Sequence, residues 1–102
     1  MQIIFNQEAA EQLKKTHTVL ELEVFENDGK LYPTYCVVPP EKINLLEFPY
    51  LENYKDLHNG FLNAMRNEDY RLCSEIAKHL MGKFGGELDT FYEEILKRLS
   101  PK

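Results

Sequence analysis

The sequence has no long apolar run, few cysteines and no excess of basic residues, and each absence excludes a class of protein. Its uninterrupted apolar stretches are only a few residues long, as at Cys36 to Val38, whereas a membrane-spanning helix needs about 20 apolar residues. The first residues, Met1 to Asn6, lack the basic and apolar regions of a secretory signal. Two cysteines among 102 residues indicate reduced thiols rather than a disulfide framework. We therefore expect a soluble cytoplasmic protein without a membrane partner.

The charge balance argues against a nucleic-acid partner. Twelve Lys and Arg residues stand against 17 Asp and Glu residues, which gives a formal net charge of −5. Binding to a phosphate backbone depends on clustered cations. The alternative, nucleic-acid binding, requires the scattered cations to converge on one face, and these are Lys14, Lys15, Arg66, Arg71, Lys97 and Arg98.

The chain length and the change in hydrophobic period along it predict a single α+β domain over residues 1–102. Residues 1–40 form a β-rich part, 41–48 a connector and 49–100 a helical part, because the apolar period changes from two to about 3.6 after Pro49. The first part is expected to hold an antiparallel β-hairpin or small sheet and one short helix capped by Asn6. This part packs on three C-terminal helices that lie antiparallel to their neighbours. Asp69 is expected to cap the second of these helices, and Gly60 either kinks the first or allows a close neighbour.

A β-hairpin is the clearest local prediction. Apolar and polar residues alternate on both sides of Asp28-Gly29, a pair that suits a two-residue turn with positive φ. This turn predicts the cross-strand pairs Glu26 with Leu31, Val24 with Pro33, Leu22 with Tyr35 and Leu20 with Val37. One face then carries Leu20, Leu22, Val24, Pro33, Tyr35 and Val37, and the other carries Glu21, Glu23 and Thr34. Pro33 lacks an N–H, so its strand is expected at a sheet edge or at a bulge.

The second hairpin face is half apolar, which suggests a contact surface. Phe25 and Tyr32 are expected to be cross-strand neighbours there, with Val19, Cys36 and Val38 nearby, and Tyr50 and Tyr54 form another aromatic cluster. Exposed aromatic residues are typical of protein interfaces. The candidate interface therefore comprises Phe25, Tyr32, Cys36, Val38, Tyr50 and Tyr54. In the alternative interpretation, the first helix or residues 41–48 cover this face.

No spacing in the sequence indicates catalysis, a cofactor or a metal site. The glycine-rich stretch 82–86 lacks the phosphate-binding pattern that ends in Gly-Lys-Ser or Gly-Lys-Thr. No His or Cys pair has the close spacing of zinc ligands. The alternative is a small metal- or thiol-dependent enzyme that uses His58, Cys73 and His79. These side chains are otherwise a core thiol and partly buried imidazoles.

Several short runs resemble a known group of proteins. They are Leu46-Glu47-Phe48-Pro49, then Leu51, Tyr54 and Leu57-His58, and later His79-Leu80 and Gly85 to Tyr92. Together they resemble an uncharacterised family, of about this length, that is encoded by contractile-tailed phages of marine cyanobacteria. The resemblance implies a small protein that acts in the cytoplasm of an infected bacterium, and no site residues come with it. The sequence as a whole predicts a non-enzymatic accessory protein that binds another protein or itself, as a homodimer.

Overall fold

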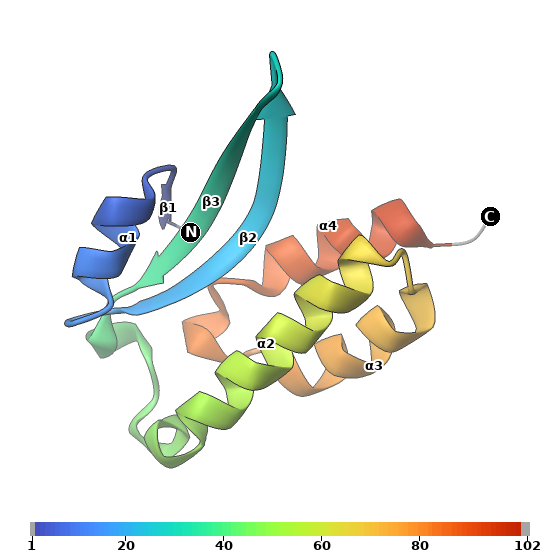
Figure 1. The fold of residues 1–102 in the computed structure, drawn as a ribbon. Coiled ribbons are helices and arrows are strands. Elements are labelled where there is room, and N and C mark those ends of the chain that lie inside the picture. Colours follow the sequence, from blue (N-terminus) through green and yellow to red (C-terminus); the bar gives the residue numbers. More distant parts are fainter. Residues whose placement is uncertain (1, 101–102) are drawn as a thin grey trace.

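The computed structural model describes residues 2–100 and confirms the α+β class (Figure 1). Residues 1, 101 and 102, which the predicted domain includes, lie outside the described residues. The strands are β1 (Gln2–Ile4), β2 (Thr18–Asn27) and β3 (Lys30–Val38). The α-helices are α1 (Gln7–Leu13), α2 (Leu51–Arg66), α3 (Tyr70–Leu80) and α4 (Asp89–Leu99). The 3₁₀ helices are η1 (Pro40–Lys42), η2 (Leu45–Tyr50) and η3 (Phe84–Gly86).

The three strands form an antiparallel sheet in the order β1-β3-β2. The predicted pairs Val24 with Pro33 and Glu26 with Leu31 are confirmed. The other two predicted pairs are wrong: Tyr35 lies opposite Glu21, and Val37 lies opposite Val19. The cause is a β-bulge, in which Leu22 and Glu23 of β2 together oppose Thr34 of β3.

The bulge changes which side chains share a face of the sheet. Leu20 pairs with Cys36 and Thr18 with Val38, and all four are buried on the face that meets the helices. Alternation along β3 then places Tyr35 and Val37 on the opposite face, where α1 contacts both β2 and β3. The predicted common face of Leu20, Leu22, Val24, Pro33, Tyr35 and Val37 is therefore wrong.

Cys36 and Val38 are corrected as interface candidates for the same reason. Both are 0% exposed and belong to the hydrophobic core. The bulge brings Leu20 opposite Cys36, so the face that carries Cys36 and Val38 meets the helices, where both pack in one cluster with Phe61, Leu80 and Tyr92. They offer no surface to a partner.

Pro33 lies in the central strand, so the expected edge strand is wrong for β3 as a whole, whereas the alternative, a bulge, is found in β2 directly before the pair of Val24 with Pro33. The proline is tolerated because β1 pairs only with residues Tyr35, Cys36 and Val37. Counting from the pair that closes the turn, Asn27 with Lys30, Pro33 occupies a position whose nitrogen points away from β2. The missing N–H would therefore lie on the β1 side of β3, and β1 does not pair with β3 at this residue.

The helical part follows its local signals closely. Asp69 caps α3, since its carboxylate accepts from the amide of Leu72 at 3.1 Å. Gly60 causes no break in α2, and a Cβ built there would meet only the Ile76 side chain of α3, at 3.6 Å. Gly85 has a positive φ and lies directly against the carbonyl oxygen of Lys42. This close approach fixes the connector on the helical part. No helix among residues 2–100 is long and apolar enough to cross a membrane.

Candidate functional site

An apolar groove lies between the helix-facing side of the sheet and α4, with a volume of about 390 Å³. We call it the hairpin groove. Ile3, Leu22, Phe25 and Thr34 line it from the sheet, Phe5 follows β1, and Thr90, Phe91, Glu94 and Arg98 line it from α4. The core therefore continues into an open apolar hollow at the end where α4 no longer covers the sheet.

The bulge is what directs Phe25 into this groove. Phe25 pairs with Tyr32, which shares a face of β3 with Thr34 and Cys36. Phe25 and Tyr32 thus lie on the helix-facing side of the sheet and are cross-strand neighbours, as predicted, but they are 52% and 41% exposed. The two-strand ribbon projects past the helices here (Figure 1). Its other face is apolar as well, because Val24 and Leu31 are exposed.

Three polar groups around the hairpin groove are already paired. Arg98 donates to both carboxylate oxygens of Glu23, at 2.6 and 3.2 Å, a bidentate geometry. The hydroxyl of Thr34 donates to the carbonyl oxygen of Glu23 at 2.7 Å. An apolar partner could therefore enter without separating this ion pair, and the exposed Glu94 lies at the edge of the groove.

A second exposed apolar surface lies on η2, and we call it the leucine turn. A capping box holds this turn: the side chain of Asn44 accepts from the amide of Leu46, and the side chain of Glu47 accepts from the amide of Asn44. The arrangement turns Glu47 inward, where it is 9% exposed. Leu45 and Leu46 point outward, at 79% and 80% exposed.

The remaining interface candidates, Tyr50 and Tyr54, belong to the leucine turn and its base. Tyr50 is exposed, and its ring centroid lies 6.5 Å from that of Tyr54. Tyr54 is half-buried, and its ring centroid lies 6.4 Å from that of Phe84. The six predicted residues thus separate into a pair at the hairpin groove, a buried pair and a pair beside the leucine turn.

His58 is the buried polar centre of the molecule. It is 0% exposed, and its Nε2 lies 2.6 Å from the carbonyl oxygen of Glu21. Because a carbonyl only accepts, Nε2 carries the proton, and Nδ1 accepts from the hydroxyl of Tyr92 at 2.8 Å. Burial lowers the pKa of His58 and raises the pKa of Tyr92. The imidazole therefore secures the sheet at the residue where the bulge begins.

The structure does not assemble His58, Cys73 and His79 into a reactive site. His58 and Cys73 are both fully buried, whereas His79 is exposed on α3. The Cys73 thiol faces the carbonyl oxygen of Phe61 at 3.8 Å, and burial raises its pKa. Over residues 2–100, no three His, Cys, Asp or Glu side chains are grouped to hold a metal ion.

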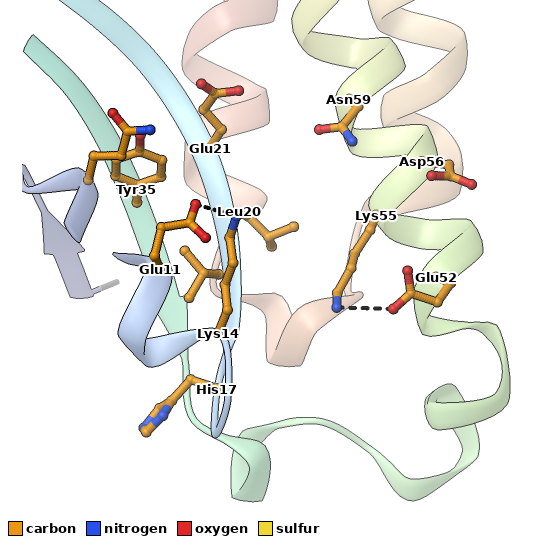
Figure 2. A pocket seen from close by; sticks show the side chains of 12 residues that line it. Glu11, Lys14, His17, Leu20, Glu21, Tyr35, Glu52, Lys55, Asp56 and Asn59 are labelled. Carbon is orange, nitrogen blue, oxygen red and sulfur yellow. Dashed lines mark hydrogen bonds and ion pairs between the residues drawn. The ribbon is translucent and has the colours of Figure 1, made fainter. Parts of the chain in front are cut away.

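A larger polar cleft of about 500 Å³ lies between α1, the sheet and α2 (Figure 2). Four of its charged side chains form pairs within their own helices. Glu11 and Lys14 of α1 are 2.9 Å apart, and Glu52 and Lys55 of α2 are 3.3 Å apart. Exposed pairs of this kind are typical of solvated helix surfaces.

The cations required for the nucleic-acid alternative are partly neutralised. Lys14 pairs with Glu11, Arg98 with Glu23, and Arg66 lies 3.8 Å from Glu21. These pairs involve three of the six cations named for that alternative.

Sequence reasoning missed the leucine turn and the role of His58. The Asn44-x-x-Glu47 spacing is the signature of a capping box and could have located the turn. No local pattern identifies His58 as the partner of a carbonyl group 37 residues away. That contact depends on the tertiary fold alone.

The fold defines the chain as a small α+β protein with two exposed apolar surfaces. No family model matches the chain, and neither a curated protein nor a solved structure matches it significantly.

Proposed function

We propose that this chain is a non-enzymatic accessory protein that works by protein–protein binding and associates with itself as a homodimer. The binding surface is the hairpin groove together with the exposed ribbon beyond it. As the resemblance noted above implies, we place this protein among phage-encoded proteins that act in the host cytoplasm.

One observation carries the proposal. Among residues 2–100, six of the 11 exposed large apolar side chains lie at the hairpin groove or on the ribbon beside it: Ile3, Phe5, Val24, Phe25, Leu31 and Tyr32. Monomeric proteins rarely expose a large contiguous apolar patch. Exposed aromatic residues next to a preformed apolar hollow are typical of interface hot spots.

The polar surroundings support the same proposal. The groove borders the Glu23–Arg98 ion pair, and the other groups at the edge are Thr90 and Glu94. An apolar centre with a polar rim is the usual anatomy of an interface.

The experiment compares self-association of the Phe25→Ser, Tyr32→Ser double variant with that of the Leu72→Ser variant, by size-exclusion chromatography with light scattering. Leu72 is a matched control because it is 46% exposed on α3, outside both apolar surfaces. We expect the double variant to be a folded monomer of 12.0 kDa at concentrations where wild type and the control are dimers. Equal association of all three proteins would overturn the proposed surface.

A further inference from the structure

We infer that the hairpin groove of one copy receives the leucine turn of a second copy. This inference rests on the proposed function, and it names the segment that occupies the groove. The chain exposes two apolar surfaces. The hairpin groove is a hollow, and the leucine turn carries Leu45 and Leu46, which are 79% and 80% exposed.

The distribution of exposed apolar residues supports this pairing. Leu45, Leu46, Phe48 and Tyr50 are exposed on the leucine turn, and six more lie at the hairpin groove or on its ribbon. Of all the exposed large apolar residues described, Leu72 alone lies outside these two surfaces. Each surface thus has a counterpart of the same chemistry on every other copy of the chain.

The leucine turn is held in a shape ready to bind. The capping box fixes its backbone, and the contact of Gly85 with the Lys42 carbonyl anchors the segment before it. An ion pair between Lys42 and Glu87 adds a second anchor. These hydrogen bonds already hold Glu47 inward and the two leucines outward. The turn therefore loses little conformational entropy when it binds a partner.

The charges on the two surfaces are compatible with this contact. Within the leucine turn, the only ionisable carboxylate is Glu47, which is turned inward. At the hairpin groove, Arg98 is already paired with Glu23. Docking the turn would therefore bury apolar side chains and leave Glu94, which also lines the groove, at its polar rim. Lys83, which lines the hollow beside the leucine turn, carries the opposite charge.

The two surfaces lie at opposite ends of the molecule, with the ribbon at one end and η2 at the other (Figure 1). One chain cannot fill its own groove in this arrangement. Two antiparallel copies can fill each other's grooves, so each contributes both surfaces to a two-fold dimer. A stable interface takes about 800 Å² from each partner, about an eighth of the 6776 Å² surface of this chain.

The test uses two variants that each lack one surface. The turn variant carries Leu45→Ser and Leu46→Ser, and the groove variant carries Phe25→Ser and Tyr32→Ser. Because all four side chains are exposed, circular dichroism should find both variants folded. We expect each alone to associate about 100-fold more weakly than wild type. A 1:1 mixture should form a heterodimer, since the intact turn of one variant can enter the intact groove of the other.

The outcomes separate this inference from the proposed function. If the turn variant dimerises like wild type while the groove variant does not, the groove binds protein but the leucine turn is not its occupant. If both variants are monomeric and their mixture stays monomeric, the two surfaces do not meet, and the inference is overturned. If wild type is itself monomeric at every concentration, the proposed homodimer fails, and this inference fails with it.

Discussion

The Nε2 atom of His58 on α2 lies 2.6 Å from the carbonyl oxygen of Glu21 on β2, at the residue where the β-bulge begins. This hydrogen bond satisfies a backbone group next to the irregular part of the ladder. Thr34 satisfies the carbonyl oxygen of Glu23 in the same way. The bulge in turn directs Phe25 toward the hairpin groove, so a buried core residue supports the candidate binding surface.

Removing the Tyr92 hydroxyl should destabilise the fold. In Tyr92→Phe, Nδ1 of His58 loses its donor at 2.8 Å and stays buried without a partner. An unsatisfied buried polar group costs about 1–3 kcal/mol. Urea denaturation should show that the free energy of unfolding falls by this amount in Tyr92→Phe. In the exposed control Tyr50→Phe it should fall by no more than about 0.5 kcal/mol. Equal stability of the two variants would mean that the His58–Tyr92 bond contributes nothing.

Stability should fall below neutral pH because of His58. Its pKa is lowered in the folded protein by burial, while the unfolded chain binds a proton near the ordinary value of 6.5. The unfolded state therefore holds more protons as the pH drops below about 6.5, and the free energy of unfolding decreases by up to about 1.4 kcal/mol per pH unit.

The measurement for this prediction compares urea denaturation at pH 7.5 and pH 5.5 in three proteins. The His58→Gln variant should lose this part of the pH dependence, and the exposed-site variant His79→Gln should keep it. An unchanged slope in His58→Gln would show that another group is responsible.

Both thiols should be unreactive in the folded protein. Burial, assisted by the charge of Glu87, raises the pKa of Cys36 to about 11, so at pH 8 only about one thiol in a thousand is ionised. Cys73 is also fully buried. A thiol reagent such as a disulfide dye should label neither cysteine on the timescale that labels both in denaturant. Rapid labelling of either one in the native state would contradict this packing.

Substituting Gly85 should destabilise the connector and the leucine turn with it. A Cβ at this position would collide with the Lys42 carbonyl oxygen, and φ is +69°. Gly82 is the matched control, because its φ of +80° carries the same backbone strain, while the space around it is open. In thermal or urea unfolding, Gly85→Ala should lower the free energy of unfolding by at least about 1 kcal/mol more than Gly82→Ala does. Equal losses would mean that the contact with Lys42 adds no constraint.

The sequence predicts the elements of this fold better than it predicts their contacts. Local chemistry suffices for the Asn6 and Asp69 caps and for the Asp28-Gly29 turn. The bulge is different, because it is stabilised by His58, which lies far along the chain. Alternation of side chains alone favours a regular ladder, and for that reason the face of Cys36 and Val38 was expected to point outward, whereas both are buried.

The same reason limits prediction of the candidate site. Phe25 and Tyr32 were found as cross-strand neighbours because the turn sets their register. The groove beside them was not predicted from the sequence, since it depends on how α4 lies against the sheet. Leu45 and Leu46 lie in the predicted connector 41–48, whose structure the sequence did not specify, and they are exposed where the capping box turns Glu47 inward.

Sedimentation equilibrium of the wild-type chain over a wide range of concentration tests the central claim most directly. We expect the average mass to rise from that of a 12.0 kDa monomer to twice that value and to stop there, as two copies fill each other's grooves. A mass that stays at 12.0 kDa throughout would contradict the account.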